Sequence, residues 1–361
     1  TLTNTYKTNS WDDTYAYYTI GQNAYLDDNG DAIADVRWNN DNTTLWMIHN
    51  DGNTIGGSGS FRNKYTLSET ENAAPNTKAN MEELLFIFGD AITKDGNTYT
   101  LVADITIGED KKGYFPISIE NGVTFDGGRG DGHTITYTGS SGWEGLFIPV
   151  SGTDVGQIEF TIQYINFVLD GTNGANVTGG HGCILASSYD GTNPNLRFDY
   201  FSVTIDNCHT SATNSIVIDG VNSAEISGAD CGGICGKALG RENSTGTITN
   251  CTNSIPISGS NAGGICGAYF QGTVTSCSNS GEIIGQDSGG ICGKYAGKNT
   301  SVTVTNCNNS GAISGKFAGG ICGFEADNYT IEGCNNLGYI NADYAGGICG
   351  GRPLNGTIQY C

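Results

Sequence analysis

Residues 208–361 repeat one sequence pattern with small changes, and this repetition constrains the fold more than any other feature of the chain. Clear copies are GTVTSCSNSGEIIGQDSGGICG from Gly272, SVTVTNCNNSGAISGKFAGGICG from Ser301 and YTIEGCNNLGYINADYAGGICG from Tyr329. Self-similarity at a period of roughly 20–50 residues is the signature of solenoids and related proteins, in which each copy stacks on its neighbours. The sequence therefore predicts a repeat protein.

Each copy fixes the same few positions relative to its first cysteine. A threonine precedes that cysteine by four residues, and an isoleucine or valine precedes it by three. From Cys251 onward, isoleucines follow it by six and by fourteen residues. Each copy thus holds three short β-prone segments, separated by Gly, Ser and Asn, and each segment has one apolar residue that can point inward. We predict an all-β fold, a parallel β-helix built as a three-sided solenoid with about 24–30 residues per turn.

Two other repeat architectures fit this pattern less well. A string of hairpins needs alternating apolar residues along both strands, whereas these segments have a single apolar anchor that suffices only when like residues stack between turns about 4.8 Å apart. Helical repeats are excluded by composition, because Gly, Ser, Thr and Asn occupy the positions where a helix needs good helix formers.

Residues 1–78 do not repeat, and they hold three of the four tryptophans together with many tyrosines. Short alternating runs such as TYAYYTI and TLWMIH predict a small β-rich head or assembly arm. Asp27, Asn29 and Asp31 have the oxygen density of a calcium loop, which makes calcium the one cofactor candidate. The EF-hand spacing is missing, so an Asx-rich turn is the stronger interpretation.

Asn80 to Gly89 is predicted to be a helix that begins the second part of the chain, residues 79–207. Asn80 can cap it, Glu83 stands in the capping-box position, and Met81, Leu84, Leu85 and Phe88 form an apolar face. Such a helix would cover the open end of a solenoid, where core and strand edges are otherwise exposed. Irregular β-helix turns are expected from there to residue 207, and regular ones over 208–361.

Two stretches resemble known families. VTFDGGRGDGHTITYTG, GLF and INFVLDG, which follow Tyr99, look like the opening turns of right-handed parallel β-helix proteins of the pectate-lyase-like superfamily. AGGICG followed by GTVTSC or YTIEGC resembles the bacterial GLUG repeats, although cysteine in the second apolar slot departs from their pattern. The resemblances cover Asn80 to Cys361. They imply a right-handed β-helix and exposure on large surface or secreted proteins, including adhesins and flanking regions of proteases.

The thirteen cysteines point to an oxidising compartment, and twelve of them fall into two columns. The first column is the cysteine after each Thr-Ile/Val segment, from Cys208 to Cys361, and the second is the cysteine of each GGIC segment, with Cys183 as a loose first member. Our preferred pairing joins each cysteine of the second column to the next one of the first, which staples the variable loop between them. The competing scheme joins each first-column cysteine to the one fifteen residues later, as in Cys251 with Cys266, but leaves Cys183 and Cys361 unpaired. A same-column ladder also remains open, because stacked residues lie within disulfide range. Cys231 is left over and is a candidate for an intermolecular bond. The preferred pairs are Cys183 with Cys208, Cys235 with Cys251, Cys266 with Cys277, Cys292 with Cys307, Cys322 with Cys334, and Cys349 with Cys361.

A formal charge of −21 argues against binding nucleic acid, and no apolar run is long enough to span a membrane. There is no initiator Met and no signal-like segment, so a trimmed secreted chain is expected. Several Asn-x-Ser/Thr triplets fall in the loop after GGICG, where a glycan could be exposed. A secreted or cell-surface glycoprotein is therefore predicted. The candidate glycosylation sites are Asn42, Asn176, Asn243, Asn250, Asn299, Asn308, Asn328 and Asn355.

The expected function is a non-enzymatic subunit of an extracellular filament or surface coat. The array shows no capping turn before Cys361, which favours head-to-tail assembly with copies of itself. The alternative is a monomeric adhesin or carbohydrate-binding module, with surface glycans or other extracellular proteins as partners. A polysaccharide-cleaving β-helix ranks third. An ice-binding β-helix ranks beside it, because Thr-x-Thr recurs in three successive turns: Thr247 with Thr249, Thr273 with Thr275, and Thr303 with Thr305.

Overall fold

The computed structural model describes residues 81–361 except 129–131, 141, 150–157, 188–200, 215–216, 219–220, 223 and 241–243. Before residue 81 it describes the course of five strands. The chain forms two compact units, Thr1–Asp90 and Ala91–Cys361. The candidate calcium ligands Asp27, Asn29 and Asp31 lie outside the described residues.

The first unit contains antiparallel strands and one helix. Strand β1 (Thr5–Thr8) pairs with β2 (Tyr15–Tyr18), and β4 (Ala32–Trp38) pairs with both β3 (Tyr25–Leu26) and β5 (Leu45–His49). The predicted β-rich head or assembly arm over residues 1–78 stays a prediction.

Helix α1 (Met81–Phe88) occupies the predicted segment. Met81, Leu84, Leu85 and Ile87 are buried, and the helix ends at Gly89, whose positive φ of 53° is easy only for glycine. A 3-10 turn (Gly89–Ala91) follows. The predicted role of the helix as a cover for the solenoid stays a prediction.

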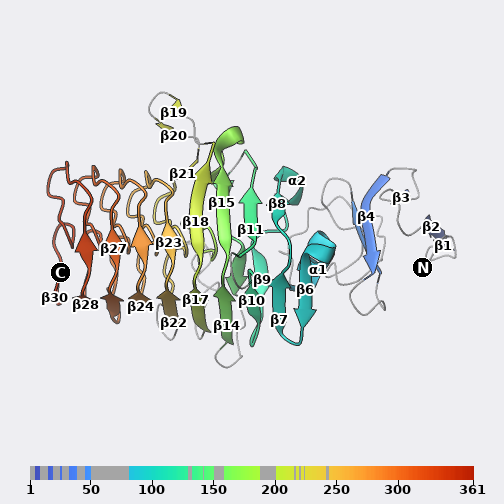
Figure 1. The fold of residues 1–361 in the computed structure, drawn as a ribbon, viewed down its shortest axis with the longest axis horizontal. Helices are drawn as coiled ribbons and strands as arrows, with labels where there is room; N and C mark the ends of the chain where they lie inside the picture. Colours follow the sequence, from blue (N-terminus) through green and yellow to red (C-terminus); the bar gives the residue numbers. More distant parts are fainter. Residues whose placement is uncertain are drawn as a thin grey trace. The chain divides into compact units, whose positions relative to one another are not determined.

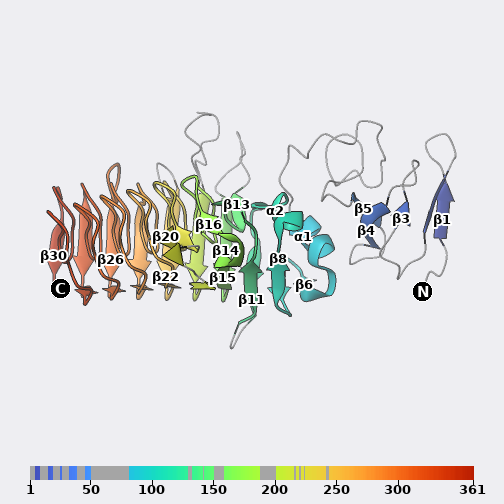
Figure 2. The same ribbon diagram turned by 90° about the horizontal axis from the view of Figure 1, so that it is seen from above.

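The second unit is built around two long sheets whose strands alternate along the chain (Figures 1 and 2). The first has ten strands, all parallel except for the antiparallel pair of β6 with β7 at one edge. In sheet order they are β6 (Ile92–Asp95), β7 (Thr98–Leu101), β10 (Thr124–Asp126), β14 (Ile158–Gln163), β17 (Phe201–Asp206), β22 (Thr245–Thr249), β24 (Gly272–Thr275), β26 (Val302–Thr305), β28 (Tyr329–Glu332) and β30 (Thr357–Gln359).

The second sheet has eight parallel strands. They are β8 (Ile105–Ile107), β11 (Thr134–Tyr137), β15 (Asn166–Asp170), β18 (His209–Thr213), β23 (Thr252–Asn253), β25 (Ser278–Asn279), β27 (Asn308–Asn309) and β29 (Asn335–Asn336). From β22 onward each turn contributes one strand to each sheet, which is why the turns stack side by side in Figure 1.

Short elements complete the unit. Strands β12 (Gly142–Trp143), β16 (Asn176–Val177) and β21 (Glu225–Ile226) form a parallel sheet, and β9 (Ile117–Ile119) pairs with β13 (Phe147–Pro149). The two-strand antiparallel pair is β19 (Val217–Ile218) with β20 (Val221–Asn222). The described helical segments here are α2 (Glu109–Lys112) and a 3-10 turn (Gly171–Asn173).

A third series of contacts between turns runs through single bridges instead of strands. Ile257, Ile283, Ile313 and Ile340 pair in succession, as do Gly263 with Gly289 and Cys266 with Cys292 in the GGIC segments. Of the three β-segments predicted in each copy, only the one before the cysteine is a strand: the segment at Ile257 pairs through a single bridge, and GGIC is a bend with a bridge at each side. Together, the parallel sheets and bridges fit a parallel β-helix.

The apolar anchors chosen from the repeat are buried, as predicted. Ile248, Val274 and Val304 of the first sheet are fully inaccessible, and so are Ile257 and Ile265 farther along their turn. In the irregular turns the core is aromatic instead: the Trp143 ring lies 4.6 Å from Tyr137 and 5.5 Å from Phe167, centroid to centroid. One apolar residue per segment is enough because each contacts its equivalents above and below.

Threonine forms an unbroken row on the first sheet. The predicted register is confirmed from Thr204 to Thr357, and it extends backward through strands that the repeat did not reveal. Nine parallel strands contribute to the row: Thr98, Thr124, Thr161, Thr204, Thr247, Thr273, Thr303, Thr330 and Thr357. The neighbouring row holds Thr249, Thr275 and Thr305 before Glu332 replaces threonine.

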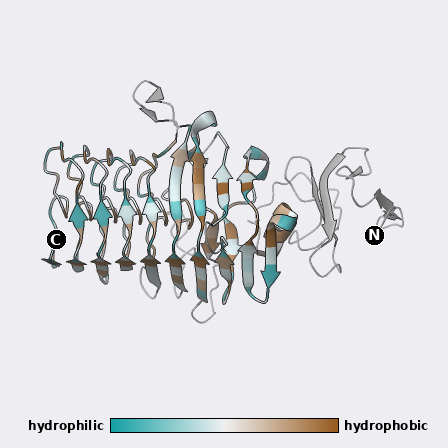
Figure 3. Ribbon diagram, in the orientation of Figure 1, coloured by the Kyte–Doolittle hydropathy of each residue, from teal (hydrophilic) through white to brown (hydrophobic). Residues whose placement is uncertain are grey.

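A ladder of buried asparagines runs inside the second sheet. Asn253 Nδ2 donates to Asn279 Oδ1 at 2.8 Å, Asn279 to Asn309 at 2.8 Å, and Asn309 to Asn336 at 2.7 Å, across turns of 26, 30 and 27 residues. Each amide also donates to a backbone carbonyl two residues on. In Figure 3 these strands are white to teal, whereas β15 of an earlier turn is partly brown. The ladder lets polar residues occupy the interior at little cost, since their hydrogen bonds are made.

The second glycine of each GGIC segment makes room for this ladder. A Cβ on Gly264 would lie 2.6 Å from Asn279 Cγ, and one on Gly290 would lie 2.7 Å from Asn309 Cγ. In the first such turn, Thr210 replaces the asparagine, and its Oγ1 donates to Asn253 Oδ1 at 2.9 Å. The bridges Gly182 with Gly232 and Leu185 with Cys235 place Cys183 at the position of that glycine. Cys183 is therefore outside the second cysteine column, to which the repeat pattern had assigned it.

Candidate functional site

The first cysteine column is a ladder of thiols that follow β17, β22, β24, β26, β28 and β30, and all of them are buried except Cys361. The backbone N–H of Cys251 donates to Cys277 Sγ at 3.4 Å, and that of Cys277 donates to Cys307 Sγ at 3.4 Å. The Cys277 thiol in turn donates to the carbonyl of Thr275 at 3.3 Å. Each thiol thus satisfies a backbone N–H of the turn before it and a carbonyl of its own turn.

The second column, Cys235, Cys266, Cys292, Cys322 and Cys349, is joined by bridges between successive members. Burial raises the pKa of the Cys266 thiol well above its usual value, and the thiols that affect it are those of Cys235 and Cys292 in the same column. All thirteen cysteines are free thiols in this structure. The preferred cross-loop pairs stay a prediction, but the contacts favour the alternative of links within a column.

Cys231 is fully buried, and burial raises the pKa of its thiol to about 12. Its Sγ lies 3.8 Å from the carbonyl oxygen of Val177, and its charge affects the pKa of Cys183. A thiol in this position is not available to another molecule. Its burial argues against the predicted intermolecular bond.

The candidate glycosylation sites differ in exposure. Asn250, Asn299, Asn308, Asn328 and Asn355 are exposed, whereas Asn176 is half-buried and Asn42 and Asn243 lie outside the described residues. Two of these exposed side-chain amides already make hydrogen bonds within the fold. Asn250 Nδ2 donates to Asp206 at 2.9 Å, and Asn355 Nδ2 donates to Asp327 at 2.9 Å. Asn299 and Asn328 are the exposed loop sites whose side-chain nitrogen has no such bond among the described contacts.

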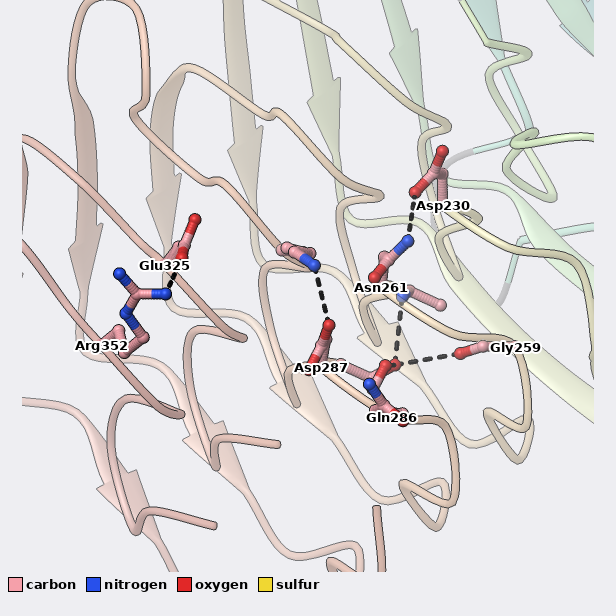
Figure 4. Close-up of polar contacts among 10 residues, drawn as sticks. Asp230, Gly259, Asn261, Gln286, Asp287, Glu325 and Arg352 are labelled. Carbon is pink, nitrogen blue, oxygen red and sulfur yellow. Dashed lines mark hydrogen bonds and ion pairs between the residues drawn. The ribbon is translucent and has the colours of Figure 1, made fainter. Parts of the chain in front are cut away.

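The richest surface feature is a stripe of aromatic and cationic side chains at the corner that the GGIC bend forms. Two rows of residues with left-handed backbone flank each bend; Asp230, Asn261 and Asp287 belong to one row (Figure 4), and Tyr269 and Tyr295 to the other. We call this surface the corner stripe. Its aromatic members are Tyr269, Tyr295, Phe317, Phe324 and Tyr344. Its cations are Lys237, Lys294, Lys298, Lys316 and Arg352.

Contacts run without interruption along the corner stripe. The ring centroids of Tyr269 and Tyr295 are 4.7 Å apart, and those of Phe317 are 5.3 Å from Phe324 and 5.1 Å from Tyr344. Lys294 Nζ joins the two groups of rings, since it lies 4.9 Å from the centroids of both Tyr295 and Phe324. These distances allow attraction between each ammonium group and the aromatic faces.

Three acids neutralise part of this charge. Lys294 Nζ lies 2.7 Å from Asp287 Oδ2, and Lys237 pairs in the same way with Asp230. Arg352 lies 3.1 Å from Glu325, as Figure 4 shows. Burial works to lower the pKa of Lys294, but the hydrogen bond and charge of Asp287 outweigh it and raise that pKa. Asp287 Oδ1 is buried and has no hydrogen-bond partner. The described ion pairs do not include Lys298 or Lys316, both of which are exposed.

Sequence reasoning missed the corner stripe and the asparagine ladder. The ladder had a signal, because asparagine follows the first cysteine by two residues in four copies. The corner stripe had a weaker signal in the sequence. Residues seven positions apart across GGIC are of types that attract each other: Asp230 with Lys237, Asp287 with Lys294, and Phe317 with Phe324.

In the described part of the chain, no group of three or more His, Cys, Asp or Glu side chains is arranged to hold a metal ion. The described helices include none long and apolar enough to cross a membrane. Near the Gly-rich turn, Asp126 accepts from the Gly128 N–H and from Gln163 Nε2, both at 2.8 Å, and His133 Nδ1 lies 3.5 Å from Asp104 Oδ1.

The chain matches no protein-family model and no curated protein. Among solved structures it is similar to one described as a "putative immunoglobulin A1 protease" from Bacteroides ovatus, with 21% sequence identity and a TM-score of 0.44. The similarity covers 73% of this chain and 77% of that chain. The likeness to GLUG repeats is not shown by these comparisons, whereas the parallel sheets fit the β-helix part of the resemblance.

The prediction that the chain is not an enzyme is contradicted by this comparison, because the similar structure is named a protease. We therefore withdraw it. No activity takes its place, since a likeness at this level does not carry chemistry from one protein to another.

Proposed function

We propose that residues 91–361 form a right-handed, three-sided solenoid that serves as the rigid part of an extracellular filament or surface coat. Support for three sides comes from the two sheets and the series of bridges in each regular turn. Extracellular placement, glycans on the exposed sequons and cross-links within the cysteine columns belong to the same proposal. Such a rod would join to another copy end to end.

The observation that carries the proposal is the uninterrupted stacking of strands in two long sheets of residues 91–361, which gives a stiff array that can be extended by one turn after another. We expect a neighbouring copy to continue this stacking on the face of β29 and β30, the last strands in the order of their sheets. Large apolar side chains are exposed on the same turn: Leu337 at 79%, Tyr339 at 74%, Leu354 at 53%, Ile358 at 45% and Tyr360 at 82%. An apolar surface beside open strand edges is a template for adding another strand.

The other half of the proposed contact is the β-rich region before residue 79, which would cover this face on a neighbouring copy. Light scattering after gel filtration and electron microscopy of the whole chain test the idea. We expect the mass to rise with protein concentration and elongated particles to form. A chain that stays monomeric, or that forms the same fibres after deletion of residues 1–78, would refute it.

Ile358→Glu places a charge on the proposed contact and should abolish assembly. Ile284→Glu is the matched control, because Ile284 is similarly exposed, at 39% against 45%, in the middle of the array. Equal loss of assembly in both variants would mean that added charge alone disperses the protein.

A further inference from the structure

The corner stripe concentrates positive charge on an acidic chain. Six lysines and arginines follow residue 200, and five of them lie on the stripe, the exception being Arg241. Its five cations and the three acids in ion pairs with them leave a balance of +2, which exposed Asp343, one turn from Lys316, lowers to +1, whereas the whole chain carries −21. Lys298 and Lys316 supply this excess, because Lys298 Nζ rests over Tyr295 at 3.6 Å and Lys316 Nζ over Phe317 at 5.0 Å without a carboxylate.

We propose that the corner stripe is a docking surface for an acidic polypeptide segment. Carboxylates of the segment would pair with Lys298 and Lys316, and its apolar side chains would cover the rings of Phe317 and Tyr344. Phe317, within the array, is half-buried, so its ring still has apolar surface to bury. Tyrosine and arginine are among the residue types that dominate the energy of protein interfaces, and the lysines would add complementary charge.

The length of the stripe defines the size of the segment. Its residues come from five successive turns, marked by Lys237, Tyr269, Tyr295, Phe324 and Arg352, so it extends over roughly 19 Å at about 4.8 Å per turn. An extended chain of about six residues spans that distance. The backbone of the bend is already paired with neighbouring turns, as in the bond from the Tyr269 N–H to the Lys294 carbonyl at 2.8 Å. Recognition therefore rests on side chains alone.

Fluorescence anisotropy with the whole chain tests this proposal. The probe is a labelled ten-residue peptide of alternating glutamate and leucine, and the comparison peptide has lysine in place of glutamate. We expect saturable binding of the acidic probe that weakens as salt is raised, since the added contacts are exposed charge pairs. No binding of the acidic probe, or equal binding of both peptides, would overturn the proposal.

The double variant Lys298→Gln, Lys316→Gln should bind the acidic probe about tenfold more weakly, because two exposed charge pairs are lost. Lys94→Gln is the matched control: Lys94 Nζ also rests over a tyrosine ring, 5.2 Å from Tyr99, but on another part of the solenoid. Wild-type affinity in the double variant, or an equal loss in the control, would also overturn it.

Heparin separates a peptide site from a general anion site. Tight binding of heparin with no binding of the acidic peptide would assign the surface to anionic glycans and refute this proposal. The outcome is independent of end-to-end assembly, because the Ile358→Glu variant keeps the corner stripe intact and should bind the probe like the wild type.

Discussion

Asn309 gives the sharpest test of the asparagine ladder. Its Nδ2 donates to Asn336 Oδ1 at 2.7 Å and to the Gly311 carbonyl at 2.9 Å, and its Oδ1 accepts from Asn279 Nδ2 at 2.8 Å. Asn309→Ala removes all three bonds and leaves at least the Asn279 N–H and the Gly311 carbonyl buried without a partner. Each such group costs about 1–3 kcal/mol, so we expect the variant to lose about 3 kcal/mol of stability.

The neighbouring residue supplies the control. Asn308 stands on the same strand, β27, but faces outward and only accepts a bond from Asn335 Nδ2 at 3.2 Å. Asn308→Ala should change stability by less than about 0.5 kcal/mol, as usual for surface positions. The pair compares the same substitution on the two faces of one strand.

Urea unfolding of both variants, followed by circular dichroism, measures the difference. Because each turn contacts only its neighbours, loss at one turn can also open the array locally. Amide hydrogen exchange of β25 and β27 should therefore accelerate in Asn309→Ala and not in Asn308→Ala. Equal shifts of the two unfolding midpoints, with unchanged exchange, would refute the ladder as a stabilising network.

Three further outcomes follow from other contacts. Burial raises the pKa of Glu225, because the folded state disfavours the charged carboxylate. The contribution of Glu225 to the stability of the fold is therefore fully present at acid pH and is lost as the pH rises through its folded pKa. Glu225→Gln should be more stable than wild type at neutral pH and equal in acid, and a wild-type pH profile of unfolding would contradict this. After refolding in a glutathione redox buffer, in which the thiols are accessible before the array closes, non-reducing peptide mapping should link Cys266 to Cys292 or Cys235; a link to Cys277 would restore the cross-loop scheme. In a host that attaches N-glycans, mass spectrometry should find higher occupancy at Asn299 than at Asn250, whose amide is engaged, and the reverse order would disprove the exposure argument.

The repeat predicts the interior columns because their chemistry does not change from turn to turn. Ile248, Val274 and Val304 are recognisable as inward residues from spacing alone, and all are buried. The asparagines at the second position after each cysteine were overlooked, since asparagine between β-segments is usually a sign of an exposed turn. Only the register of stacked turns shows that Asn279 and Asn309 face each other inside.

Cys183 shows a second limit of reading the repeat. Its order, Gly-Cys-Ile, nearly matches Gly-Ile-Cys, so spacing could not separate a column member from a substitute for glycine. The structure separates them through volume. Where the ladder residue is Thr210 instead of asparagine, a cysteine occupies the space that Gly264 and Gly290 leave for Asn279 and Asn309.

The same reasoning explains why the variable positions of the repeat are the informative ones for function. Interior columns must repeat, because each side chain stacks on its equivalent, whereas the corner has to satisfy only contacts across one bend and to the next turn. There the chain places an ion pair, Asp287 with Lys294, in one turn and a pair of aromatic rings, Phe317 with Phe324, in the next. Folding alone requires that the two side chains across the bend suit each other, and either a charged or an aromatic pair would do. The gathering of nearly all cations of the second half along this line is therefore left to be explained by what the surface contacts, which is why the corner stripe, and not the thiol or asparagine ladder, is the place to look for a partner.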